Sequence, residues 1–128
     1  MTDALADTSF FIGRESDRPM HLERVPERLG VSFVTIGELR TGVLIAVDAD
    51  SRSRRLQTLL VALSLDPIPV DDPVADAWAR LRVNLRDRNL RMPVNDSWIA
   101  ATAIAHGVPL VTQDDDYADV PGLEVIHV

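Results

Sequence analysis

Six acidic residues lie where a predicted strand ends or a predicted helix begins: Asp7, Glu38, Asp96, Asp114, Asp115 and Asp116. In a parallel sheet such positions share one edge, so we expect their carboxylates to converge. Clustered carboxylates repel one another unless hard divalent cations neutralise them. Because the set offers oxygen ligands without His or Cys, it favours Mg²⁺ or Mn²⁺ over zinc. The pattern therefore predicts metal-assisted hydrolysis of a phosphodiester.

Two of these acids also have a purely structural interpretation. Asp7 follows a short apolar segment and is a good N-cap for a helix after it. Thr35-Ile36-Gly37-Glu38 matches a capping box ahead of an apolar-periodic helix, which accounts for Glu38 without any chemistry. A carboxylate that binds a metal cannot also reach fully back to the cap. From the residues alone, both interpretations stay open.

The most informative stretch runs from Pro93 to Tyr117. Residues 98–105 are apolar on every side, which predicts a buried helix. Gly107 is the expected residue just beyond its end, and Pro109 prevents continuation. The short apolar run Val108–Val111 is typical of a buried parallel strand. Asp96 opens this unit and the acidic triplet closes it.

Strands and helices alternate along the whole chain. The expected strands cover residues 3–6, 31–34, 67–70, 108–111 and 123–128, and the main helices cover 35–46, 51–65, 73–85 and 98–105. Pro67 and Pro69 suit an edge strand, and residues 14–29 predict a polar loop with a short helix. This alternation predicts an α/β fold: a three-layer domain, residues 1–128, whose mainly parallel central sheet is flanked by helices.

The composition excludes several classes of protein. There is no Cys, so disulfides and thiolate metal sites are excluded. All 13 basic residues are Arg, which removes chemistry that needs a P-loop Lys or a Schiff base. No apolar run approaches the roughly 18 residues of a membrane span. Without a signal-like N-terminus in residues 1–6, we expect a soluble cytoplasmic protein.

The arginines give a modest signal for nucleic acid. A formal charge of −7 argues against binding driven by bulk charge. Five arginines nevertheless gather on and after the helix predicted at 73–85: Arg80, Arg82, Arg86, Arg88 and Arg91. Asp76 and Asp87 dilute this patch. Arg82 and Arg86, together with Arg14, are candidate contacts for a phosphate backbone.

Four segments of the chain resemble, in order and at normal spacing, the motifs of PIN-domain ribonucleases. They are Asp7-Thr8-Ser9, Thr35-Ile36-Gly37-Glu38-Leu39, Asn95-Asp96-Ser97-Trp98-Ile99-Ala100-Ala101-Thr102-Ala103 and Leu110-Val111-Thr112-Gln113-Asp114-Asp115-Asp116-Tyr117. The resemblance is strongest to VapC-type toxins of bacterial toxin–antitoxin pairs. The third segment with the strand after it is the most specific part, whereas Asp-Thr-Ser alone is weak.

The resemblance implies a PIN-like fold and a Mg²⁺- or Mn²⁺-dependent endoribonuclease. It implies an acidic quartet of Asp7, Glu38, Asp96 and Asp116, with Asp7, Asp96, Asp114 and Asp116 as metal ligands. Thr8 or Ser9 would orient the first acid or the attacking water. The family further implies an RNA substrate, a homodimer, and an antitoxin that wraps an apolar groove and neutralises a growth-inhibiting toxin.

The last motif departs from the family pattern. Many relatives have Thr-x-Asn-x-x-Asp-Phe, whereas this chain has Thr112-x-Asp114-x-Asp116-Tyr117. The departure leaves open which of Asp114 and Asp116 binds metal directly. We expect both to do so, with Asp115 directed to solvent.

Two other functions compete with a nuclease. One is a non-catalytic binding module of the same fold, in which the acids are a residual patch; the intact acids argue against it. The other, weaker alternative is a Mg²⁺-dependent phosphotransfer domain. Such domains normally use a Lys near the phosphoryl group, and this chain has none.

Overall fold

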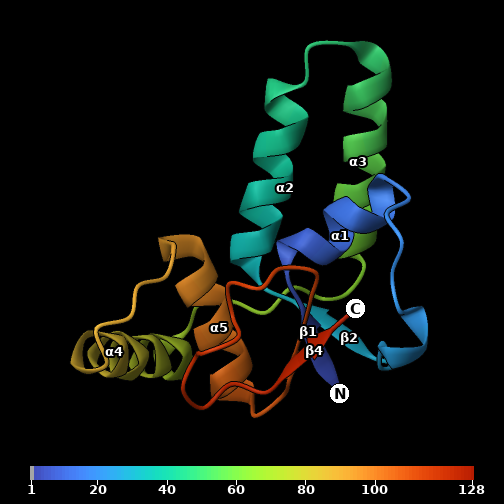
Figure 1. The fold of residues 1–128 in the computed structure, drawn as a ribbon. Coiled ribbons are helices and arrows are strands. Elements are labelled where there is room, and N and C mark those ends of the chain that lie inside the picture. Colours follow the sequence, from blue (N-terminus) through green and yellow to red (C-terminus); the bar gives the residue numbers. More distant parts are fainter. Residues whose placement is uncertain (1) are drawn as a thin grey trace.

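The computed structural model describes residues 2–128 and has an α/β architecture (Figure 1). Its helices are α1 (Thr8–Glu15), α2 (Phe33–Ile45), α3 (Ala49–Leu63), α4 (Asp72–Asp87) and α5 (Val94–His106), with a short 3₁₀ turn η1 (Leu22–Arg24). Its strands are β1 (Ala4–Ala6), β2 (Leu29–Val31), β3 (Leu110–Thr112) and β4 (Val125–His127). No helix in this described part of the chain has the length and apolar character needed to cross a bilayer.

The four strands form one sheet in the order β2-β1-β3-β4, and each neighbouring pair is parallel. The strand expected at 67–70 is reduced to a single parallel bridge between Ile68 and Ser32. The amide of Ile68 donates to Val31 and its carbonyl accepts from Phe33. The prolines on either side of Ile68 have no N–H to donate, so the ladder cannot extend.

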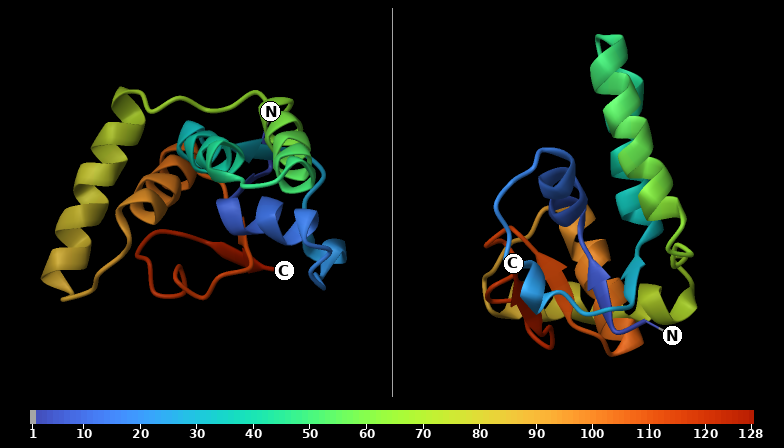
Figure 2. Two further views of the ribbon diagram at one scale, coloured as in Figure 1. Left: turned by 90° about the horizontal axis from the view of Figure 1, so that it is seen from above. Right: turned by 90° about the vertical axis from the view of Figure 1, so that its right-hand side faces the viewer.

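Helices cover both faces of the sheet, which confirms the three-layer prediction (Figure 2). Ala4 and Ala6 pack into a core with residues of α1, α2 and α3. Leu5, between them, faces a second core built with α4 and α5. Because successive side chains of a strand point to opposite faces, three residues of β1 serve both cores. β1 is fully buried, so Asp7 emerges directly from the centre of the fold.

Helix α5 covers the predicted residues 98–105 but begins four residues earlier, at Val94. It contains the buried small residues Ala100, Ala101 and Ala103, which allow neighbouring elements to approach closely. Gly107 ends it in the left-handed conformation at φ 63°, which glycine adopts without a Cβ penalty. The first turn of α5 lies at the carboxyl edge of the sheet, beside the starts of α1 and α2 (Figure 1).

The capping box predicted for α2 is wrong. The helix begins at Phe33, and Ser32 is the N-cap, accepting from the amide of Val34. The preceding strand accordingly ends at Val31, three residues earlier than expected. Thr35 and Glu38 therefore lie inside the helix. Glu38 has no capping role, and its side chain is available to the sheet edge.

Helices α2 and α3 form a hairpin that projects away from the sheet (Figures 1 and 2). Its tip carries exposed apolar side chains: Leu44 is 76%, Ile45 68% and Val47 95% exposed. Such a contiguous apolar surface is unusual on a chain without a binding partner.

Candidate active site

Side chains from three helix starts and one strand end line a single pocket at the carboxyl edge of the sheet. The pocket is lined by Asp7, Thr8, Ser9, Ile12, Arg18, Glu38, Asp96 and Asp114. Four carboxylates separated by up to 107 positions of sequence thus share one cavity. The convergence expected from their places at strand ends and helix starts is present.

Asp7 is the most buried of these acids, with 2% of its surface exposed. It caps α1 as the sequence allowed, because Oδ1 accepts from the amide of Phe10 at 3.1 Å. Ser9 donates to the same oxygen at 2.7 Å, and Thr112 donates to Oδ2 at 2.7 Å. Burial raises the pKa of Asp7, and these three hydrogen bonds oppose the rise.

Glu38 is held by a hydroxyl from another helix. Thr8 donates to Oε1 of Glu38 at 2.6 Å, and its hydroxyl also lies 3.1 Å from that of Thr35. The contact connects the first turn of α1 to the second turn of α2. Thr8, predicted to orient a group in the site, thus orients Glu38, while Ser9 orients Asp7.

Asp96 lies in the first turn of α5 and is half-buried. Loss of solvation raises its pKa to about 6, and the negative charges of Glu38, Asp116 and Asp7 add to the rise. The buried Tyr117, whose hydroxyl faces the carboxylate, opposes this rise in the pKa of Asp96. Burial and the nearby acids in turn raise the pKa of Tyr117, so the phenol stays protonated as a donor.

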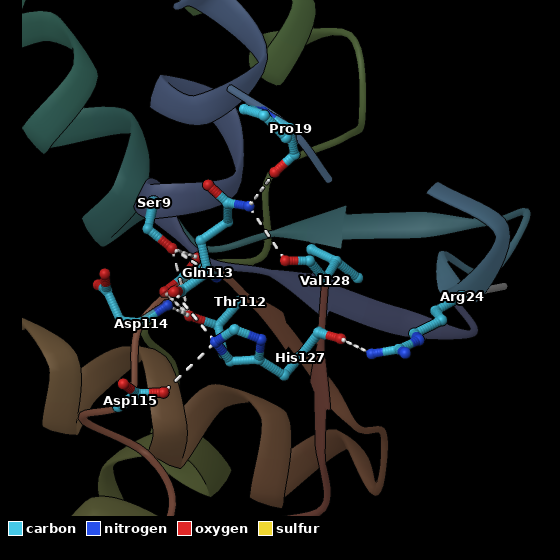
Figure 3. A network of polar contacts seen from close by, with 10 residues as sticks. Ser9, Pro19, Arg24, Thr112, Gln113, Asp114, Asp115, His127 and Val128 are labelled. Carbon is cyan, nitrogen blue, oxygen red and sulfur yellow. Dashed lines mark hydrogen bonds and ion pairs between the residues drawn. The ribbon is translucent and has the colours of Figure 1, made fainter. Parts of the chain in front are cut away.

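The segment after β3 is fixed by a polar network (Figure 3). The Gln113 side-chain amide donates to the carbonyls of Val128 at 3.0 Å and Pro19 at 3.2 Å. His127 Nε2 lies 3.1 Å from the Gln113 carbonyl and 3.4 Å from Asp115 Oδ1. The Asp115 side chain is 99% exposed, as expected for a solvent-directed residue.

Asp114 and Asp116 differ in their positions. Asp114 lines the pocket, and its backbone amide donates to Thr112 at 2.9 Å. Asp116 is exposed and does not line the pocket, although its charge raises the pKa of both Asp114 and Asp96. Of the two acids left open by the sequence, Asp114 lines the cavity, whereas Asp116 is exposed and lies outside the lining.

The candidate arginines are not brought to this pocket. Arg14 lines a separate groove between α1 and α3, beside Phe10 and Phe11. Arg82 and Arg86 lie on α4 and line a different cavity. Arg18 instead reaches the acids, and its charge lowers the pKa of Asp114 against the larger effect of burial.

The oxygen ligands fit a hard divalent cation in type but are not in a closed coordination shell. No three His, Cys, Asp or Glu side chains within residues 2–128 lie close enough together to hold a metal ion. Like charges push the carboxylates apart, and Asp7 and Glu38 are held by hydroxyl groups. The carboxylate and hydroxyl oxygens that line the pocket are of the type that Mg²⁺ or Mn²⁺ prefers.

Sequence reasoning missed three residues of this site. Thr112 and Tyr117 belong to the last of the four motifs, but neither was predicted to be a functional residue. Arg18 lies in the predicted polar loop and was not predicted to reach the site. Thr112 ends a buried apolar strand, and a hydroxyl at that position could have indicated a residue of the site. Nothing in the sequence separates Arg18 from Arg14, because the turn after α1 decides which of them reaches the acids.

The match to the PIN domain family covers residues 4–123. The chain belongs to this family. Within it, the chain is similar to two ribonucleases of Mycobacterium tuberculosis. It is 50% identical to Ribonuclease VapC4 over 125 residues, covering 98% of this chain and 96% of that one. It is 44% identical to Ribonuclease VapC5, covering 95% and 93%.

Solved structures show the same relationship. The VapBC-5 member of the VapBC toxin–antitoxin family from Mycobacterium tuberculosis has a TM-score of 0.89 at 40% identity, covering 98% of both chains. FitAcB from Neisseria gonorrhoeae has a TM-score of 0.75 at 27% identity, covering 96% of both chains. The resemblance expected from four short motifs thus extends over nearly the whole chain and its fold.

Proposed function

We propose that this chain is a VapC-type endoribonuclease that cleaves RNA phosphodiesters with Mg²⁺ or Mn²⁺ and acts as a growth-inhibiting toxin. One observation carries the proposal: Asp7, Glu38, Asp96 and Asp114 line one pocket at the carboxyl edge of the sheet. The similarity to proteins named VapC ribonucleases supports it. RNA rather than DNA as the substrate rests on those relatives.

In this proposal Asp7, Asp96 and Asp114 hold the cation, Asp116 is a further ligand, and Glu38 completes the quartet. A bound divalent cation supplies an activated water and neutralises charge on the phosphate. Ser9 and Thr112 orient Asp7 and favour its ionised form by donating to its two oxygens. Tyr117 likewise favours the ionised form of Asp96. Arg18 is the cationic side chain of the pocket, and we assign it a contact to the phosphate.

We also propose an antitoxin partner and a homodimer in the cytoplasm. The solved relatives include toxin–antitoxin complexes, and this chain carries an exposed apolar tip at the α2–α3 hairpin. A second apolar groove runs beside Phe10, Phe11 and Arg14. Co-purification with a co-expressed VapB-type antitoxin tests the partner, and light scattering of the isolated chain tests the dimer.

The enzymatic proposal is tested by RNA cleavage with a metal titration. Purified protein is incubated with total bacterial RNA in EDTA and then with added Mg²⁺ or Mn²⁺, with Asp96→Asn as the matched control. We expect metal-dependent cleavage by the natural chain and none by the variant, and sequencing of the new RNA ends gives the target. Binding of neither metal, together with intact RNA, would instead favour a non-catalytic module.

A further inference from the structure

A second cavity, of about 440 Å³, lies on the opposite side of the first turn of α5 from the acidic pocket. Ser97 and Val94 line this cavity, while Asp96 of the same turn lines the acidic pocket. The floor is apolar, with Leu85 and Met92. The two cavities are therefore adjacent, separated by one helical turn.

Trp78 and Arg82, which line this cavity, belong to a layered stack that Trp98 completes from outside the lining. Trp78 and Trp98 lie face to face, with ring centroids 4.0 Å apart and planes 5° apart. Trp78 is fixed further by a 2.9 Å hydrogen bond from its indole N–H to Ser97. On α4, one turn beyond Trp78, the guanidinium of Arg82 lies 4.6 Å from the centre of the Trp78 ring. The stack thus ends in an exposed guanidinium group at the mouth of the cavity.

The charge of the cavity is opposite to that of the protein. Arg82, Arg86 and Arg91 line it and no acidic residue does, although the chain holds 20 acids and 13 arginines. Arg86 has an exposed ion pair with Asp87, which screening makes weak. Within residues 2–128, neither Arg82 nor Arg91 forms an ion pair. A local positive site on an acidic protein indicates an anionic ligand.

We propose that this cavity binds a nucleotide of single-stranded RNA next to the bond that is cleaved, with its base stacked on the Arg82 guanidinium that covers Trp78. Unpaired bases are recognised by stacking on aromatic rings and guanidinium planes, and arginine forks bind the backbone phosphates. Arg91 and Arg86 hold the phosphates in this arrangement. The inference rests on the proposed function, because it assumes that RNA is the substrate.

Tryptophan fluorescence tests the site directly, because both tryptophans of the chain belong to the stack. A mixed-sequence single-stranded RNA dodecamer is titrated into the protein in EDTA, where no cleavage occurs. We expect a saturable change in emission. In the double variant Arg82→Gln/Arg91→Gln we expect the midpoint of this change to shift to about tenfold higher RNA concentration, and the salt dependence to weaken by about 0.7 per phosphate contact removed.

Arg80→Gln is the matched control. It removes the same charge from the same helix, but Arg80 lines another cavity and pairs with Asp76. We expect it to bind RNA like the natural chain. Thermal unfolding of each variant confirms that the fold is retained. Equal weakening by Arg80→Gln, or unchanged affinity in the double variant, overturns the site.

Cleavage kinetics separate this inference from the proposed function. With Mg²⁺, the double variant raises KM about tenfold and leaves kcat near its natural value, since its loss is in binding. Asp96→Asn abolishes kcat and keeps the fluorescence change. If the natural chain binds RNA with this change in fluorescence but does not cleave it, the nuclease proposal is contradicted and the nucleotide site is supported. If the double variant cleaves RNA with the same kinetics as the natural chain, the site is contradicted. The site is also contradicted if the double variant changes only the oligomeric state, because the cavity would then be a protein interface.

Discussion

The hydroxyl of Thr112 donates a 2.7 Å hydrogen bond to Oδ2 of Asp7, across 105 positions of sequence. The bond joins the end of β3 to the end of β1, and both side chains are fully enclosed. The same hydroxyl accepts from the amide of Asp114 at 2.9 Å. One threonine therefore sets the orientation of the innermost acid and of the segment that carries another.

Thr112→Val should uncouple these two acids. The variant keeps the shape of the side chain but removes the donor to Asp7 and the acceptor for Asp114, so we expect cleavage to fall at least about tenfold. Leaving buried polar groups without partners costs about 1–3 kcal/mol of stability. Urea unfolding and RNA cleavage measure the two effects. Thr112→Ser, which retains the hydroxyl, should keep most of both; a Val variant with natural activity would contradict this role.

Asp7→Asn and Asp7→Ala should differ in stability but not in activity. Both remove the charge, so both should abolish cleavage. Asn can still accept from the amide of Phe10 and preserve the cap of α1, whereas Ala loses it at a cost of about 1 kcal/mol. Ala also leaves Ser9 and Thr112 without their acceptor. Thermal unfolding in EDTA should place the Asn variant above the Ala variant; equal midpoints would contradict a capping role.

The pKa of Asp96, raised to about 6, makes stability depend on pH in metal-free buffer. Between its unfolded value of 3.8 and about 6, the folded state binds more protons than the unfolded state. Folding stability therefore falls as pH rises through this window. Asp96→Asn should remove this part of the fall and be more stable than the natural chain by about 1 kcal/mol near pH 7.5, after allowance for solvent screening.

The same comparison near pH 3, below both the folded and the unfolded pKa of Asp96, should show little difference between variant and natural chain. Urea unfolding at the two pH values in EDTA measures both. A stabilisation that is equal at both pH values would mean that the charge of Asp96 is not its cause.

Arg18→Ala and Arg14→Ala should separate the two candidate phosphate contacts. Arg18 lines the acidic pocket, whereas Arg14 faces the groove between α1 and α3. Loss of a phosphate contact by Arg18 should lower kcat/KM about tenfold, equivalent to about 1.4 kcal/mol. The Arg14 variant should cleave RNA at the natural rate. The reverse result would reinstate Arg14 and remove Arg18 from the site.

The three-layer fold and most of the acidic residues in the pocket could be predicted from the sequence, because both follow from short-range patterns of apolar and polar residues. Helix α5 was recognisable from small apolar residues ended by Gly107, and Asp7 from its place after a buried strand. The start of α2 was misplaced because Ser32 and Thr35 are both acceptable caps. Strand pairing and burial, which lie outside the local sequence, decide between them.

The parts that could not be predicted depend on long-range contacts. Tyr117 reaches Asp96 only because the segment after β3 folds back over α5, and Arg18 reaches Asp114 only because the chain turns after α1. Likewise, the sequence does not show that Asp114 lines the pocket while Asp116 lies outside it. The spacing of residues along the chain does not predict these turns.

The first turn of α5 places a negative cavity and a positive cavity back to back, with Asp96 on one side and Ser97 on the other. A polyanion lying across that turn would cross a steep gradient of electrostatic potential within one nucleotide step. Monovalent salt would then have two opposite effects. It would screen the attraction between the arginines and the phosphates, and it would also screen the repulsion between a phosphate and the carboxylates. The salt concentration at which such an enzyme works best would therefore depend on the balance of these two effects on either side of the first turn of α5.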